Sequence, residues 1–273
     1  MSIQGVVLSA GGWRGYIHLG ALAVLLKEVN PDQIMLWTGC SIGALISWLM
    51  VLGITPDQIM EYLLENGEPK FTPSFNITSL LTNFGLIDME QFAKAIEELL
   101  VWCKQDLSKL GWSFEELFHN TKKHLMVCTV NLDRGRAEYF SPITTPEVLC
   151  MDAVLASCCV PGIFQARKIN GCVHIDGGRL DRFPKVKAKE YLEWLIKDQM
   201  IPSTDVVLFG VMLQKLDVGP VTNIATFIYK ILTVGSVPDH SDDPHTLFID
   251  DGGVTDPEEL YTTGMRGCQG YFL

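Results

Sequence analysis

A serine between two glycines is the first residue of this sequence that could do chemistry. Residues 39–43, Gly-Cys-Ser-Ile-Gly, follow the pattern G-x-S-x-G around Ser41. Small residues at Gly39 and Gly43 allow a sharp strand–turn–helix, which holds a serine at the top of a sheet as a nucleophile. The apolar runs 34–37 and 44–54 fit that strand and that helix. The pattern also arises by chance, so by itself it fits a buried turn serine equally well.

A glycine-rich segment, residues 10–15, follows the first apolar strand. One hypothesis is an oxyanion hole, in which the amides of Gly11 and Gly12 face a developing negative charge. The other is a dinucleotide-binding turn, which the sequence supports less well. Ala10 stands where G-x-G-x-x-G begins, and no acidic residue ends the second strand. A plain strand-to-helix turn also explains these glycines.

The serine needs a group that accepts its proton. Asp176 ends an apolar strand and is followed by Gly177 and Gly178. A carboxylate at such an exposed strand end can act as a base if a dry site raises its pKa toward neutrality. Asp251 lies in a second D-G-G sequence, but its glycines lead toward the last helix, so turn chemistry explains them. None of the six histidines occupies a distinctive loop, so a Ser–His–Asp triad finds no obvious histidine.

Apolar strands alternate with helices along the chain. Strands are predicted at 3–10, 34–37, 124–132, 136–142, 172–176 and 205–213, and helices at 16–29, 44–54, 89–103, from 114 and from 257. The strands 124–132 and 136–142 flank the short DRG turn and are predicted to form a hairpin. Asp88 with Gln91 and Ser113 with Glu116 predict capping boxes, and Asp256 predicts the start of the last helix. The alternation predicts one α/β domain over residues 1–273, with a mostly parallel central sheet and helices on both faces. Ligands of such sheets bind at the carboxyl ends of the strands.

Composition narrows the classes of function. The net charge of −11 argues against a nucleic-acid partner and against simple electrostatic docking to an anionic membrane. Eight cysteines without a C-x-x-C pair predict buried free thiols rather than zinc ligands, and so a reducing, cytoplasmic compartment. The N-terminus lacks the features of a signal peptide, and the longest apolar stretch is too short to span a membrane. We expect a soluble intracellular protein without a metal or cofactor.

In combination, these motifs resemble the patatin-like phospholipase family. AGGWRGYIHLGALAVLLKE resembles its glycine-rich oxyanion segment, and TGCSIGAL resembles its nucleophile turn. HLMVCTVNLDRGRAEYFSP, followed by DAVLASCCVPGIFQARKINGCVHIDGGRLDRFP, resembles the middle of the family and the block with its second catalytic residue. The resemblance extends from about residue 4 to about residue 214.

The resemblance implies a Ser–Asp dyad, with Ser41 as nucleophile, Asp176 as its direct partner and no histidine. It further implies an oxyanion hole from Gly11, Gly12, Arg14 and Gly15, and supporting roles for Gly39, Gly43, Gly177 and Gly178. The implied reaction is the metal-free hydrolysis of ester bonds in phospholipids or related acyl lipids. Ala10, Arg182, Cys158 and Cys159 depart from the family's usual residues, but none of these departures removes a catalytic group.

Two other classes of function stay open at this point. A catalytically inactive lipid-binding module would keep the fold, and a nucleotide-binding oxidoreductase would need the dinucleotide fingerprint that the sequence lacks. An acidic lipid hydrolase would have to meet a membrane surface through apolar contacts. The apolar segments 71–87 and 221–235 are candidates for such peripheral contact, although packing against the core explains them more simply.

Overall fold

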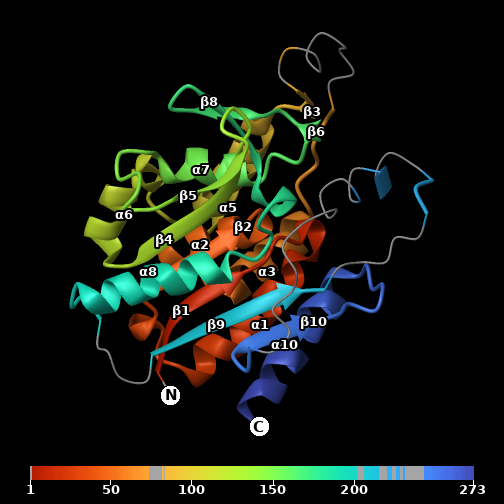
Figure 1. Cartoon of the computed structure of the whole chain (residues 1–273). Helices are drawn as coiled ribbons and strands as arrows, with labels where there is room; N and C mark the ends of the chain where they lie inside the picture. Colours follow the sequence, from red (N-terminus) through yellow and green to blue (C-terminus); the bar gives the residue numbers. More distant parts are fainter. Residues whose placement is uncertain are drawn as a thin grey trace.

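The computed structural model describes residues 2–73, 82, 84–201, 206–214, 220–222, 226–227, 230 and 243–273. Its main sheet has eight strands, in the order β10-β9-β1-β2-β4-β8-β7, with β5 also paired to β4 (Figure 1). The strands are β1 Ser2–Leu8, β2 Leu36–Cys40, β4 His124–Asn131, β5 Arg136–Phe140, β7 Arg167–Ile169, β8 Cys172–Asp176, β9 Val206–Leu213 and β10 Thr246–Ile249. A second, two-stranded sheet pairs β3 Gly85–Ile87 with β6 Gly162–Phe164.

Strand direction divides the main sheet into two parts. The strands β10, β9, β1, β2 and β4 are parallel to one another. β5 and β8 run antiparallel to β4, and β7 runs antiparallel to β8. The predicted α/β fold with a mostly parallel sheet is therefore confirmed. The predicted hairpin of β4 and β5 is confirmed as well, whereas the antiparallel direction of β8 and β7 was not predicted.

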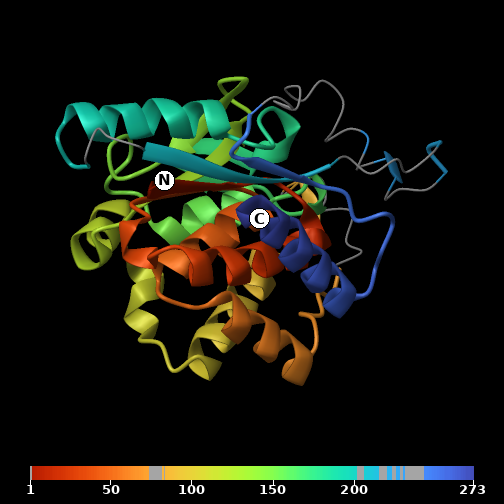
Figure 2. The ribbon, with the colours of Figure 1, turned by 90° about the horizontal axis from the view of Figure 1, so that it is seen from below.

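Helices cover both faces of the sheet, as predicted. They are α1 Gly15–Glu28, α2 Ile42–Val51, α3 Pro56–Asn66, α5 Met89–Trp102, α6 Phe114–Thr121, α7 Cys150–Ser157, α8 Lys185–Lys197 and α10 Pro257–Phe272. Figure 2 shows α8 on one face of the sheet and α1, α2 and α10 on the other. The larger apolar core lies on the second face, and a smaller one lies under α8.

Helix starts follow local hydrogen-bonding chemistry. The predicted capping box of Ser113 and Glu116 is confirmed, and Asp256 accepts a 2.9 Å bond from the N–H of Glu259. Asp88 caps α5 through the N–H of Glu90, but the capping box predicted with Gln91 is wrong. The Gln91 side chain instead hydrogen-bonds to both backbone groups of Thr72.

The N-terminal and C-terminal helices pack unusually closely. A Cβ at Gly20 on α1 would overlap the carbonyl of Tyr261, and one at Gly264 on α10 would overlap the carbonyl of Ile17. Both helices need glycine here because their backbones touch. The C-terminal segment therefore packs directly against the helix that follows the glycine-rich loop.

Two expectations about membranes came from the sequence: that no segment spans a bilayer, and that two apolar segments are candidates for lipid contact. Within the described residues, no single helix is long and apolar enough to cross a bilayer; only the pair α2 and α3, bent by 116°, has the length and composition together. Of the two segments suggested for lipid contact, the structure describes 71–73, 82 and 84–87 of the first and 221–222, 226–227 and 230 of the second; the rest of 71–87 and 221–235 lies outside the described residues.

Candidate active site

Ser41 occupies a strained turn between β2 and α2. β2 ends at Cys40 and α2 begins at Ile42, as the G-x-S-x-G pattern predicts. The backbone of Ser41 has φ 55° and ψ −127°, a conformation that costs free energy in any residue other than glycine. The side chain is nearly buried, with 6% of the residue exposed. Such strain is typical of a side chain that a turn holds in one functional direction.

The flanking glycines are needed for backbone contact. A Cβ at Gly39 would overlap the backbone of Gly43, which lies one helical turn further on. A Cβ at Gly43 would overlap the carbonyl of Leu8 and come within 2.7 Å of that of Ser9 at the end of β1. The pattern therefore follows from close packing of the turn against its own helix and against β1.

Asp176 lies next to Ser41, although the strand β8 that ends at Asp176 runs in the opposite direction to the strand β2 that precedes Ser41. Because β8 is antiparallel to β4, Asp176 pairs with Thr129, one residue beyond the register of Cys128 and Cys40. The expected exposed strand end is wrong, since Asp176 is only 3% exposed. Its carboxylate accepts a 2.7 Å bond from the N–H of Gly178, and the Ser41 side chain lies near enough to lower the pKa of Asp176.

The surroundings of Asp176 adjust its acidity. Burial raises the pKa of Asp176 from 3.8 to about 6, while the polar contacts of Ser41, Gly178 and Cys40 with the carboxylate lower it. A Cβ at Gly177 would lie 2.6 Å from the carbonyl of Cys128, so that glycine lets the aspartate turn approach β4. The result is a carboxylate that can exchange a proton near neutral pH.

The glycine-rich loop offers two free amides. Gly12 has φ 57°, which requires glycine. The N–H of Arg14 donates to the carbonyl of Gly11 at 3.2 Å, and that of Gly15 donates to Gly12. Within the described part of the chain, the N–H groups of Gly11 and Gly12 have no acceptor. Of the four predicted oxyanion residues, the two glycines are therefore the ones with amides available to a ligand.

The Arg14 side chain binds the C-terminal part of the chain. Its guanidinium donates to Asp251 Oδ2 at 3.0 Å and to the carbonyl of Gln214 at 2.9 Å. Asp251 also accepts a bond from the N–H of Gly253, which is the predicted turn chemistry. The structure thus brings Asp176 to Ser41 and brings the rival Asp251 to Arg14.

The described histidines are engaged elsewhere. His18 Nε2 donates to the carbonyl of Ser9 at 2.9 Å, and burial lowers the pKa of His18 to about 4. His174 hydrogen-bonds to Thr129, and His124 to Tyr191. Among the histidines that the structure describes, none has a hydrogen bond to Ser41 or Asp176. His240 lies outside the described residues.

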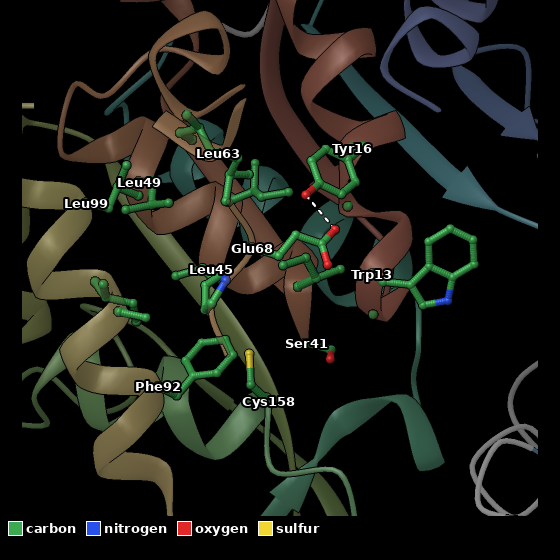
Figure 3. Close-up of a pocket in the computed structure, with 18 of the residues that line it drawn as sticks. Trp13, Tyr16, Ser41, Leu45, Leu49, Leu63, Glu68, Phe92, Leu99 and Cys158 are labelled. Carbon is green, nitrogen blue, oxygen red and sulfur yellow. Dashed lines mark hydrogen bonds between the residues drawn. The ribbon is translucent and has the colours of Figure 1, made fainter. Parts of the chain in front are cut away.

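An apolar cavity of 330 Å³ opens beside Ser41 (Figure 3). Its wall is formed mainly by aliphatic and aromatic side chains, among them Leu19, Leu45, Leu49, Leu63, Phe92 and Leu99. Tyr16 and Glu68 form a 2.8 Å hydrogen bond within this lining. A cavity of this size and polarity suits the hydrocarbon part of a ligand.

Ser157 and Arg182 hold the turn of Ser41 and the glycine-rich loop in place, and the sequence did not predict either contact. Ser157, at the end of α7, accepts a 2.8 Å hydrogen bond from the N–H of Ser41. Arg182 accepts a bond from the N–H of Ala10 and donates to the carbonyl of Leu213 at 2.8 Å, joining the glycine-rich loop to β9. The departure from the family residue at position 182 was visible in the sequence, but nothing there signalled the role of Ser157.

The cysteines and other possible metal ligands were also the subject of predictions from the sequence. All eight cysteines are free and six of them are buried, as predicted. In the described ranges, no cluster of three or more His, Cys, Asp or Glu residues could hold a metal ion.

A mixed α/β sheet with a serine turn beside an apolar pocket fits the class of lipid hydrolases. The chain belongs to the patatin-like phospholipase family, whose model matches residues 6–185.

The chain is also similar to individual proteins. The chain is 29% identical over 212 residues to "Probable lipid hydrolase 463L" of Invertebrate iridescent virus 6, covering 73% of this chain and 70% of that protein. It is 24% identical over 193 residues to "cGAMP-activated phospholipase" of Vibrio cholerae, covering 62% of this chain and only 50% of that enzyme. The crystal structure of VipD from Legionella pneumophila shares the fold, with a TM-score of 0.58 and 16% identity over 100% of this chain and 66% of VipD.

Proposed function

We propose that the chain is an acyl hydrolase that cleaves carboxylic ester bonds of phospholipids or related acyl lipids through a dyad of Ser41 and Asp176. The observation that carries the proposal is the position of the strained Ser41 beside the buried Asp176 at the edge of an apolar cavity. The family and the names of the two relatives support the same substrate class.

The first half of the reaction forms an acyl-enzyme. Asp176 accepts the proton of the Ser41 hydroxyl while the oxygen attacks the ester carbonyl carbon. The amides of Gly11 and Gly12 stabilise the negative charge on the carbonyl oxygen. The carbon–oxygen bond to the alcohol then breaks, and the departing oxygen takes the proton from Asp176.

The second half releases the acid. Asp176 accepts a proton from water, which attacks the acyl carbon, and the proton returns to Ser41 Oγ as the fatty acid leaves. The hydrocarbon chain occupies the apolar cavity during both halves, so binding and orientation are provided away from the reacting bond.

Contact with a lipid surface is part of the proposal. Since the net charge is −11, attraction to an anionic membrane does not supply the binding free energy. Trp13, 46% exposed and next to Gly12, is positioned to enter the interface beside the cavity. We infer a peripheral, apolar contact there.

A fluorophosphonate probe, which reacts with activated serines, tests the proposal. Peptide mapping should place the label on Ser41, and Ser41→Ala should abolish labelling and reduce ester hydrolysis by up to about 10⁶-fold. Ser47→Ala, on the helix α2 that follows the turn, is the matched control, because the Ser47 hydroxyl donates to the carbonyl of Thr38. Labelling elsewhere would overturn the choice of nucleophile. An unlabelled, inactive wild type that still binds vesicles would instead indicate a lipid-binding module.

A further inference from the structure

A buried ion pair joins the glycine-rich loop to a part of the chain outside the family match. Arg14 Nη1 lies 3.0 Å from Asp251 Oδ2, and the two residues are 237 positions apart. Their side chains are 3% and 0% exposed. The family model ends at residue 185, so Asp251 belongs to a segment that this match does not cover.

The pair is held firmly at both ends. Asp251 Oδ1 accepts a 2.9 Å bond from the N–H of Gly253, and Arg14 Nη1 also donates to the carbonyl of Gln214. Charges removed from water need such additional hydrogen bonds to offset desolvation. With these partners, the position of the guanidinium is fixed relative to the turns after β9 and β10.

The position of Arg14 determines the shape of the loop. The N–H of Arg14 donates to the carbonyl of Gly11, closing the 3-10 turn that contains Gly12. The Gly11–Gly12 peptide group therefore belongs to a turn that ends at Arg14. The Arg14 side chain fixes this end of the turn through its bonds to Asp251 and Gln214. Gly12 has no side chain and a left-handed φ, so its conformation depends on its neighbours.

Other contacts hold the two ends of the loop. The N–H of Ala10 donates to Arg182 at 2.7 Å, before the turn. After the turn, α1 packs against α10 at Gly20 and Gly264. The ion pair adds an anchor between these points, next to the free amides.

We propose that Asp251 is a positioning residue for the reaction: through Arg14 it holds the amides of Gly11 and Gly12 in the orientation that stabilises the oxyanion. This inference rests on the proposed function of the loop. The C-terminal segment would therefore contribute to catalysis indirectly, because Asp251 contacts Arg14 and not a reacting atom.

Removing both charges separates positioning from stability. Replacing a buried ion pair by apolar residues of similar size is often neutral for stability. The double variant Arg14→Met/Asp251→Leu should therefore still fold, with a Tm lowered mainly because the N–H of Gly253 and the carbonyl of Gln214 lose their partners. Its kcat on a soluble short-chain ester should fall about 10²-fold with KM within about threefold, the size of effect known for loss of one oxyanion donor.

Two inhibitors distinguish binding of the oxyanion from binding of the unreacted substrate. A trifluoromethyl ketone with the substrate's acyl chain forms a tetrahedral adduct with the serine and places an oxyanion in the hole. An ether analogue of the ester only occupies the ground-state site. The double variant should bind the ketone about 10²-fold more weakly and the ether within about threefold of wild type.

A second ion pair supplies the control. Lys185 and Asp243 are paired at 2.7 Å near the same C-terminal strand, away from the loop. Asp243→Asn should lower Tm but leave kcat and ketone affinity within about twofold. If the double variant does not fold, Arg14→Lys decides by the same readings, since it keeps the charge but loses the planar fork; kcat should fall about tenfold at constant KM.

The outcomes are distinct. A folded double variant, or Arg14→Lys, with wild-type kcat and ketone affinity would overturn the inference and leave the pair a purely structural contact. Wild-type protein that neither hydrolyses the ester nor binds the ketone would instead overturn the proposed function. The wild type is therefore measured in every series.

Discussion

The backbone N–H of Ser41 donates a 2.8 Å hydrogen bond to Ser157 Oγ, which donates in turn to the carbonyl of Cys128 at 2.6 Å. One hydroxyl on α7 thus connects the strained turn to the neighbouring strand β4. The N–H of Asp176 bonds to the carbonyl of Cys159, two residues after Ser157. The end of α7 therefore fixes both members of the proposed dyad relative to each other.

We predict that Ser157→Ala impairs catalysis more than stability alone explains. The substitution leaves the N–H of Ser41 and the carbonyl of Cys128 unpaired, which should cost about 1–3 kcal/mol in free energy of unfolding. A small displacement of the nucleophile should also lower kcat by about 10- to 100-fold. Ser47→Ala, which removes another buried hydroxyl bond from α2, should change stability only. Equal kcat in the two folded variants would contradict this role.

The pH dependence of activity should follow Asp176. Burial raises the pKa of this carboxyl to about 6, and only the ionised form accepts the proton of Ser41. On a neutral short-chain ester, kcat/KM should fall about tenfold per pH unit below about 6 and level off above it. A profile governed instead by a group near pH 7, and abolished by a histidine substitution, would argue against the dyad.

Asp176→Asn should be inactive and, at alkaline pH, more stable than the wild type. Because the folded pKa of Asp176 is above its unfolded value, the folded state binds the extra proton between about pH 4 and 6. Wild-type stability therefore decreases as pH rises through that window, by up to about 3 kcal/mol at 1.4 kcal/mol per pKa unit. Thermal melts at pH 8 should favour the asparagine variant, and the advantage should disappear near pH 4. No difference at pH 8 would mean that the buried charge is better compensated than we infer.

Histidine substitutions should be tolerated. His18 donates to a carbonyl next to the glycine-rich loop and His174 lies on β8, so these two are the most sensitive tests. His18→Gln and His174→Gln should keep kcat/KM within about tenfold, or roughly 1.4 kcal/mol of activation free energy. A well-folded variant that loses a thousandfold would indicate a Ser–His mechanism.

The cavity should set the preferred acyl chain length. Ala95 on α5 lines the cavity and is not fully buried, so a larger side chain there can fill the space without disrupting the core. Ala95→Trp should reduce kcat/KM for long-chain esters at least tenfold while leaving short-chain esters within about threefold. Lys94→Trp is the matched control, because the neighbouring Lys94 side chain is 75% exposed. Loss of both ester classes in Ala95→Trp alone would place the acyl chain elsewhere.

Much of the site could be predicted because it depends on local chemistry. The turn at Ser41 needs Gly39 and Gly43 for backbone contact, and that need is written in consecutive residues. Gly12 likewise marks a left-handed turn, and Asp256 marks a helix start. Each of these features involves residues only a few positions apart, so a short stretch of sequence carries the whole requirement.

The sequence favoured Asp176 over Asp251 from their neighbouring residues, but only the tertiary structure shows what each carboxylate contacts. Each of the two D-G-G sequences follows a short strand. β8 runs antiparallel to β4 and places Asp176 beside Ser41. β10 extends the parallel part of the sheet and is followed by Asp251, which pairs with Arg14. Strand direction depends on pairing between residues far apart in the chain, which hydrophobic periodicity does not encode. The sequence by itself determined the types of residue available for chemistry and the turns that hold them. The burial that raises the pKa of Asp176, the hydroxyl of Ser157 and the partner of Arg14 were decided by tertiary packing, because each arises only when distant segments come into contact.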